Sequence, residues 1–426
     1  MKKKNYLDLF AGAGGLSEGF ILEGFNPIAH IEMDEAACNT LRTRQAYHWL
    51  KKNKRIGIYN DYLEGRISRH ELYREIPKDL IDSVICSEIN KQNIKNIFSE
   101  IDKKLYGAEV DLIIGGPPCQ AYSLVGRARD SKKMIGDKRN YLYLLYCEFL
   151  KKYKPTIFVF ENVLGLLSAK DSDNEKYVDK MMEKFKSLGY EMQCQVIDCS
   201  QYGVPQSRKR VIIIGKAKDK LIDFPIIKKM KNRVLVKELL KDLPPLKSGE
   251  GEFLGTEYIS DAADYLYKVG VREKDLDKVT YHVCRKTNAR DLDIYRRVVE
   301  LWNDEGKRLS YNSLPNNLKT HKNRTSFVDR YKVVEGNSYF SHTMVAHIAK
   351  DGHYYIHPDI NQNRTISVRE AARIQSFPDN YYFESKGEKP SMAPALKQIG
   401  NAVPVVLSRR IAKAIKVVIH KGDKNG

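Results

Sequence analysis

The chain has 426 residues, enough for a large domain and a smaller one, each with its own hydrophobic core. It carries 73 lysines and arginines against 54 acidic residues, a formal net charge of +19. This excess suits a polyanionic partner, because each neutralised phosphate releases counterions, although a soluble lysine-rich protein would show the same balance. No stretch approaches the roughly 20 apolar residues of a membrane span, which excludes a membrane-spanning protein of that kind.

Cysteine usage and the amino terminus indicate where the protein works. The 7 cysteines have no paired spacing, which argues against a disulfide framework, and no pair has the CxxC spacing of a zinc site, so we expect no metal. The basic start at residues 1–5 leads into a strand pattern rather than a long apolar segment, which argues against a signal peptide. We therefore expect a cytoplasmic protein without membrane association.

The first elements predict a turn that binds a ligand. Residues 6–9 form an apolar strand pattern, and Gly12, Gly14 and Gly15 follow before a helix begins. Glycines permit a tight turn and let a ligand approach the backbone, and a helix N-terminus offers free N–H donors. A helix entry that simply needs room would look the same.

An acidic residue follows at a distance typical of nucleoside-binding folds. Glu32 ends the next apolar stretch, at 27–31, about where such folds place a carboxylate against a ribose. Ser17 stands where a dinucleotide fingerprint has Gly or Ala, so a nicotinamide or flavin cofactor fits less well. The pattern favours a nucleoside cofactor of another kind.

The first half of the chain alternates short apolar runs with helical patterns, which is typical of a doubly wound α/β sheet. The charged stretch at 42–104 is longer than a simple crossover needs, so we expect extra helices there and assign them no chemistry. The strand candidates are 6–9, 27–31, 112–114, 156–160, 193–197 and 211–214.

Cys119 is the most informative single residue. It follows the apolar run 110–114 and the segment Gly115-Gly116-Pro117-Pro118, which predicts a buried strand that stops abruptly. The thiol would then lie on a stiff loop at the carboxyl edge of a sheet, where open α/β sheets bind ligands. Taken alone, Cys119 could equally be a buried core cysteine.

Charged residues accompany two later strand candidates. Glu161 follows the apolar run 156–160, so it emerges from a buried strand, where desolvation raises the pKa of a carboxyl and favours its acid form. Arg208 and Arg210 stand at the start of another strand, and alternation places them on one face. A surface glutamate and a structural ion pair are the alternatives.

The composition changes after residue 215. Lysines crowd the segment 216–237, and a second basic stretch at 308–332 interleaves aromatic residues such as Tyr311 and Tyr331. This mixture suits nucleic acid, although a solvated face is the usual alternative. Near the end, one helical face carries Leu407, Ile411, Ile415 and Val418, which predicts a last helix that packs on the large domain.

Taken together, these segments show that the chain resembles the DNA (cytosine-5)-methyltransferases of the prokaryotic restriction–modification type. The resemblance runs from residue 7 to about 407 and depends on motifs in one fixed order. They match the family's cofactor loop at 8–15, its ribose carboxylate at Glu32, the nucleophile motif Pro118-Cys119-Gln120, the acid motif Glu161-Asn162-Val163, the arginine pair within 206–210, and the closing blocks at 364–378 and 398–404.

The resemblance implies S-adenosylmethionine as the cofactor and a Rossmann-like fold with a smaller, mixed target-recognition domain. Two places depart from the family pattern: Glu88 stands where an aspartate usually meets the adenine end, and Thr343-Met344 where a Thr-Leu pair is common. The residues expected to bind the cofactor are Phe10, Gly12, Gly14, Gly15, Glu32, Glu88, Pro118 and Asn401.

The resemblance also assigns catalytic roles. Cys119 would be the nucleophile, Glu161 the acid, and Arg208 and Arg210 the pair beside the target base, with Arg210 the closer match to a catalytic partner. Carbon 5 of cytosine is a poor nucleophile, and a thiolate that adds to carbon 6 converts the ring into an enamine that can attack a sulfonium methyl. A duplex hides carbon 6, so the base must be flipped out.

We therefore expect an enzyme that methylates cytosine within a specific duplex DNA sequence, acts as a monomer and pairs functionally with a restriction endonuclease. The predicted parts are a catalytic, cofactor-binding domain at 1–215, a target-recognition domain at 216–395 and a segment at 396–426 that returns to the catalytic domain. Two alternatives stay open, namely a transfer-RNA cytosine-5 methyltransferase and a catalytically silent DNA-binding protein.

Overall fold

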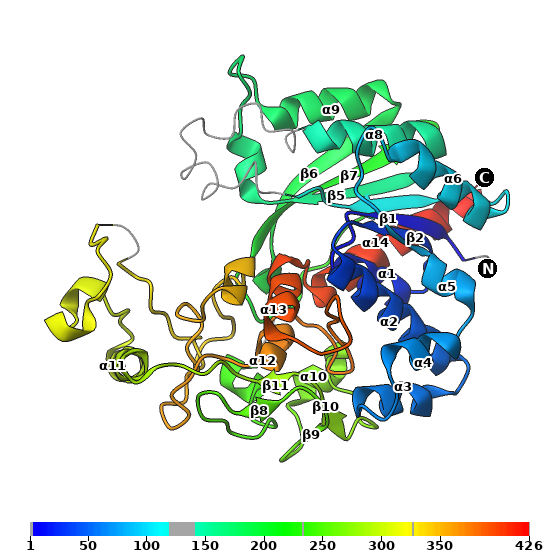
Figure 1. The fold of residues 1–426 in the computed structure, drawn as a ribbon. Helices are drawn as coiled ribbons and strands as arrows, with labels where there is room; N and C mark the ends of the chain where they lie inside the picture. Colours follow the sequence, from blue (N-terminus) through cyan, green and yellow to red (C-terminus); the bar gives the residue numbers. More distant parts are fainter. Residues whose placement is uncertain (1–2, 119–140, 232–233, 326–327, 426) are drawn as a thin grey trace.

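A computed structural model describes residues 3–118, 141–231, 234–325 and 328–425 (Figure 1). At its centre lies a seven-stranded sheet with the strand order β3-β2-β1-β4-β5-β7-β6. Its strands are β1 (Asn5–Leu9), β2 (Asn26–Glu32), β3 (Val84–Cys86), β4 (Leu112–Gly115), β5 (Ile157–Asn162), β6 (Tyr190–Asp198) and β7 (Lys209–Ala217).

Every predicted strand lies in this sheet, which confirms the α/β fold class. Strands β1 to β5 pair in parallel, whereas β7 is antiparallel to both of its neighbours, β5 and β6. The strand β3 escaped prediction because its 3 residues lie inside the charged stretch. Such a short strand shows no alternation that could be recognised.

Helices cover both faces of the sheet, and alternation along the strands decides which residues meet which helices. Ile113 faces a core built with α6 (Ile94–Leu105), α8 (Leu142–Tyr153) and α9 (Tyr177–Ser187). Leu112 and Ile114 face the opposite core, built with α1 (Gly15–Leu22) and α14 (Val405–Asn425). The predicted last helix is thus confirmed as α14. Its buried face carries Leu407, Ile411, Ile415 and Val418.

The sheet brings the predicted site to one edge. Parallel strands end on the same side, so Phe10 after β1, Glu32 at the end of β2, Gly116 after β4 and Glu161 near the end of β5 gather there. Because β7 runs the other way, it begins at this edge, close to the end of β5.

The charged stretch forms the expected helices, namely α2 (Glu35–Lys52), α3 (Ile56–Leu63), α4 (Arg69–Arg74) and α5 (Lys78–Asp82). They contribute to the same core as residues far along the chain: Tyr62 packs edge-on against Tyr382, and Tyr382 against Tyr281. Buried Glu384 accepts hydrogen bonds from the hydroxyls of Tyr62 and Thr43, each at 2.6 Å. The charged stretch thus shares a hydrophobic core with the second half of the chain.

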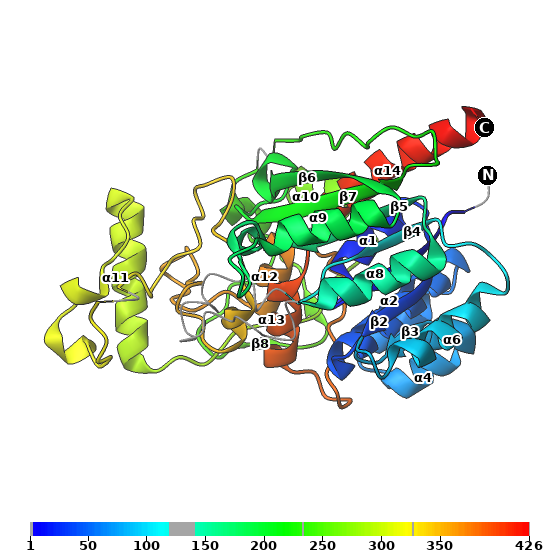
Figure 2. The same cartoon turned by 90° about the horizontal axis from the view of Figure 1, so that it is seen from above.

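The second half has less regular structure. It contains α10 (Asp264–Val269), α11 (Ala289–Glu305), α12 (Val368–Ile374), α13 (Met392–Asn401) and two short sheets that pair β8 (Gly251–Glu252) with β11 (His282–Val283) and β9 (Thr256–Glu257) with β10 (Lys278–Val279). Helix α11 lies far from the sheet and has a small core of its own (Figures 1 and 2). The three-part division at 215 and 395 stays a prediction. Over the described ranges, no helix has the length and apolarity needed to cross a membrane.

Candidate active site

The glycine turn after β1 has backbone conformations that favour glycine. Gly12 and Gly14 have φ angles of 54° and 79°, and Phe10 adopts the same left-handed region at 57°. A side chain at Gly15 would meet the carbonyl oxygen of Val403 at 2.4 Å, whereas one at Gly12 would meet nothing within 4 Å. Gly15 therefore permits close packing, and Gly12 borders open space.

Glu32 contacts this turn from the neighbouring strand. Its carboxylate accepts hydrogen bonds from the backbone N–H groups of Gly12 at 2.8 Å, Met33 at 2.9 Å and Asp34 at 2.8 Å. Burial raises the pKa of the Glu32 carboxyl, and the three hydrogen bonds, which favour the ionised form, lower it in part. The glycine turn and Glu32, both of which the sequence predicts to bind the cofactor, are thus in direct contact.

The remaining predicted cofactor ligands are more exposed. Glu88 follows β3, and its carboxylate accepts a hydrogen bond from the side-chain amide of Asn90 at 2.9 Å. Since Cys86 at the end of β3 pairs with Glu32, Glu88 lies at the same sheet edge. Pro118 and Asn401 are exposed to solvent, and Phe10 is half-buried.

Cys119, the predicted nucleophile, lies outside the described residues, but the loop that leads to it is described up to Pro118. Asn162 at the end of β5 donates its side-chain amide to the carbonyl oxygen of Pro117 at 3.2 Å, and both residues are buried. A side chain at Gly116 would meet a carboxylate oxygen of Glu161 at 2.8 Å. The end of β5 therefore holds this loop beside the predicted acid.

Glu161 and Arg210 form an ion pair across adjacent antiparallel strands. Their Oε1 and Nε atoms are 2.8 Å apart, and the two side chains are 16% and 12% exposed. Glu161 pairs with Ile212 in the sheet, so Arg210 reaches it from the diagonal position. The two predicted catalytic residues are therefore in direct contact.

Arg208 has a different environment from Arg210. Its side chain is fully buried and donates to the backbone carbonyl oxygens of Met344 and Gly400, the latter at 3.2 Å. These contacts tie the strand entry to two later blocks of the chain. Arg208 therefore contacts backbone groups of these blocks, whereas Arg210 contacts the predicted acid, Glu161, itself.

Three polar residues within the motifs received no role from the sequence, and the structure shows what they contact. Besides Asn162, these are Gln206 and Gln375, both buried. Gln206 donates to the side-chain oxygen of Gln375 at 2.9 Å, and Gln375 donates to the carbonyl oxygen of Ile399 at 2.7 Å. In the sequence, only their positions within the motifs could have indicated that these three residues contribute to the site. Across the described part of the chain, no cluster of three or more acidic, histidine or cysteine side chains could hold a metal ion.

Comparison with known proteins agrees with this geometry. The model of the C-5 cytosine-specific DNA methylase family matches residues 4–59 and 56–417. The chain is 41% identical to the type II methyltransferase M.Bpa9945I of Bacillus paralicheniformis, over 97% of this chain and 99% of that protein. It is 31% identical to the type II methyltransferase M.DdeI of Desulfomicrobium norvegicum, over 96% of this chain and 88% of that protein.

Solved structures show the same fold. The Entamoeba histolytica methyltransferase EhMeth aligns with a TM-score of 0.53 at 14% identity and covers 99% of both chains. A prophage-encoded protein of E. coli, described as a DNA modification methyltransferase, aligns with a TM-score of 0.62 at 22% identity over 98% of this chain and 100% of its own. With a family model that spans nearly the whole sequence, this chain belongs to the C-5 cytosine-specific DNA methylases and is a DNA (cytosine-5)-methyltransferase.

Proposed function

We propose that the enzyme transfers a methyl group from S-adenosylmethionine to carbon 5 of a cytosine in a specific duplex DNA sequence, through a covalent bond from Cys119 to carbon 6. The observation that carries this proposal is the Glu161–Arg210 ion pair beside the loop that Asn162 anchors at Pro117, just before Cys119. Nucleophile, acid and guanidinium would then meet at one sheet edge.

The glycine turn fits the cofactor. The open space beside Gly12, the left-handed backbone of Phe10 and the carboxylate of Glu32 would accommodate a ribose and its neighbours, and Glu88, Pro118 and Asn401 would complete the site. Gly14 and Gly15 would support the cofactor site, because they allow the turn to pack closely against neighbouring residues such as Val403. When bound, S-adenosylmethionine supplies an electrophilic sulfonium methyl.

The protein's own groups supply the rest of the chemistry. The Cys119 thiolate would add to carbon 6 of a flipped-out cytosine, which pushes electrons toward ring nitrogen N3 and makes carbon 5 nucleophilic. A proton from Glu161 would neutralise N3, and Arg210 would orient Glu161 and bind the base carbonyl. After methylation, the N3 proton would return to Glu161, and loss of the carbon 5 proton to a base would expel Cys119 as a thiolate.

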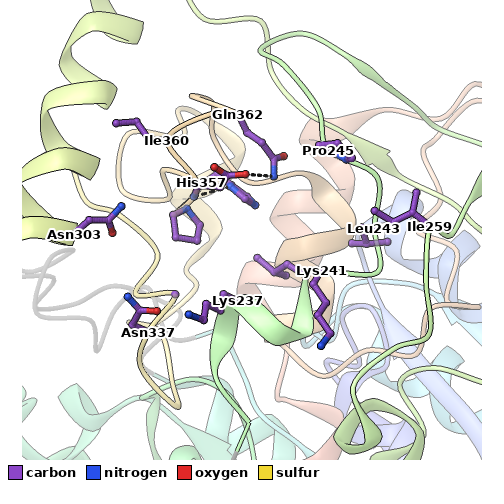
Figure 3. Close-up of a pocket in the computed structure, with 14 residues that line it drawn as sticks. Lys237, Lys241, Leu243, Pro245, Ile259, Asn303, Asn337, His357, Ile360 and Gln362 are labelled. Atoms are coloured by element: carbon purple, nitrogen blue, oxygen red, sulfur yellow. Dashed lines mark hydrogen bonds between the residues drawn. The ribbon is translucent and has the colours of Figure 1, made fainter.

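We place sequence recognition at about 216–347, within the predicted target-recognition segment 216–395. A cavity of about 490 Å³ opens in this segment, and its rim includes the exposed side chains of Lys237, Lys241, Asn303 and Asn337 (Figure 3). Lysines suit phosphate contacts, and amides suit base edges in the major groove. By contrast, Ile222 and Ile227 pack in the core with α14, so we expect the base-reading residues after Val234.

The names of the relatives support a role as the modification enzyme of a type II restriction–modification system. We propose in addition that the enzyme pairs functionally with an endonuclease and acts as a monomer. A transfer-RNA cytosine-5 methyltransferase is the alternative. Tritium incorporation into duplex DNA and into transfer RNA, measured side by side, distinguishes the two, because only the DNA enzyme should label the duplex.

The decisive experiment expresses the enzyme in a host free of DNA methylation and sequences bisulfite-treated DNA. We expect 5-methylcytosine in one sequence context with wild type and none with Cys119→Ala, which should still bind DNA because it lacks only a bond formed during reaction. Wild type should also form a denaturation-resistant adduct with DNA that contains 5-fluorocytosine. Substantial turnover by Cys119→Ala would exclude the covalent mechanism.

A further inference from the structure

Two cysteines from different elements meet beside Glu32. Cys86 is the last residue of β3 and pairs with Glu32 in the parallel register. Alternation places Cys86 on the same face as Val84, and Val84 packs in a small cluster with Cys38 of α2. The Cys38 thiol donates a hydrogen bond to the carbonyl oxygen of Glu32 at 3.3 Å. The Cys38 sulfur and the Cys86 backbone therefore both lie against the backbone of Glu32, the predicted ribose-binding residue.

The two thiols differ in access to solvent. Cys86 is exposed, whereas Cys38 is fully buried. Burial raises the pKa of the Cys38 thiol, and a hydrogen-bonded contact with Cys86 raises it further. A reagent from solvent can therefore reach Cys86 first, and the raised pKa of Cys38 makes its later attack on the modified Cys86 the slow step.

We propose that Cys86 and Cys38 form a modification site for low-molecular-weight disulfides at the cofactor-binding edge of the sheet. The Cys86 thiolate attacks one sulfur of the small disulfide, forms a mixed disulfide and releases one small thiolate. The Cys38 thiol, on losing its proton, then attacks the Cys86 sulfur and expels the second small thiol. The small disulfide is reduced to two thiols, and the protein gains one disulfide bond.

The position links this site to the cofactor, and this step rests on the proposed function. The backbone N–H of Ser87 donates to the carbonyl oxygen of Glu32 at 2.8 Å, so the segment after Cys86 lies against the segment that would hold the ribose. A small thiol attached to Cys86 would occupy space that the nucleoside needs. Bound cofactor should therefore protect Cys86, and modified enzyme should bind cofactor poorly.

Cys194 provides a matched control within the same chain. It is also exposed, but it lies on β6, at the opposite edge of the seven-stranded sheet. The full-length enzyme is treated with oxidised glutathione, and modified peptides are identified by mass spectrometry. We expect a Cys38–Cys86 disulfide in wild type and in Cys194→Ser, and a stable mixed disulfide at Cys86 in Cys38→Ser.

Cofactor protection gives a quantitative readout. At about ten times its Kd, bound cofactor should slow modification of Cys86 about elevenfold, because only the free fraction reacts, and should leave Cys194 unchanged. Absence of both products at Cys86, or reaction no faster than at Cys194, would overturn the proposal. Calorimetric titration of cofactor separates the two hypotheses: a disulfide that forms in an enzyme unable to bind S-adenosylmethionine refutes the proposed function but leaves the thiol chemistry intact.

Discussion

At the scale of single residues, the side chain of Glu161 is the clearest target for a test of mechanism. The change Glu161→Gln keeps the shape of the side chain but removes its proposed acid function and its ion pair with Arg210. We expect the rate of methyl transfer to fall by about 10² to 10⁴, as is typical for the loss of a general acid. Single-turnover assays measure this rate, and calorimetry should show unchanged cofactor affinity. An equal loss of cofactor affinity would contradict the assignment.

Asn162 tests how the nucleophile loop is positioned. The change Asn162→Ala removes the hydrogen bond to the carbonyl oxygen of Pro117, and a displacement of about 1 Å at a reacting group can cost roughly 10²-fold in rate. We expect kcat to fall by about that amount while the Kd for cofactor stays constant. Asn53→Ala serves as the control, because the Asn53 side chain donates the same kind of hydrogen bond, to the carbonyl oxygen of Trp49 at the end of α2, outside the loop. A variant with wild-type kcat would show that the loop needs no such anchor.

At the scale of elements, the glycine turn gives a matched pair of variants. Gly15→Ala places a methyl group 2.4 Å from the carbonyl oxygen of Val403, which should lower the free energy of unfolding by about 1 to 3 kcal/mol. Gly12→Ala meets no atom within 4 Å, although its φ of 54° costs some strain, so its main effect should be on cofactor binding. Urea unfolding and calorimetric titration distinguish the two. The reverse pattern would contradict this division.

The packing of α1 on α2 depends on a buried ion pair and predicts a pH dependence of stability. Burial alone would raise the pKa of Glu18, but Arg44, which contacts it at 2.6 Å, outweighs burial and holds that pKa below its usual range. The stabilisation is therefore complete above the unfolded pKa of about 4.3 and is lost as the pH falls through the folded value.

Glu18→Gln should then unfold about 3 to 5 kcal/mol more easily than wild type at pH 7, because it leaves Arg44 buried without a counter-charge. The difference should shrink by about 1.4 kcal/mol for each pH unit below about 4.3. Urea titrations from pH 7 down to 3 measure both effects. The pair of Lys216 with Glu191, whose side chain is 49% exposed, is the comparison, and Glu191→Gln should leave stability almost unchanged. A difference that stays constant over the whole pH range would count against the ion pair.

At the scale of the whole molecule, catalysis and specificity should separate. The predicted catalytic residues lie outside the segment 216–347, and the cavity that contains Lys237 and Asn337 is built largely from it. Exchange of this segment for that of another type II methyltransferase should move methylation to the sequence of the donor enzyme. Bisulfite sequencing of host DNA provides the measurement. An active chimera that keeps the original sequence would show that recognition resides elsewhere.

The sequence by itself determined the fold class and the edge of the sheet on which the site lies. Short apolar runs mark buried strands such as β1 and β4, and the residues that follow them must lie at the carboxyl edge, because parallel strands share one direction. Glu32 could therefore be placed near the glycine turn without coordinates. These inferences succeed because each depends on residues close together in the chain.

Only the tertiary structure decided which side chains meet across long separations. The contact of Asn162 with Pro117, the different environments of Arg208 and Arg210, and the approach of Cys38 to Cys86 join residues from separate elements. Local patterns give the direction of a strand but not its neighbours, its register or the side chain that faces it from a helix. These are set by packing of the whole core, where one arrangement satisfies the buried polar groups.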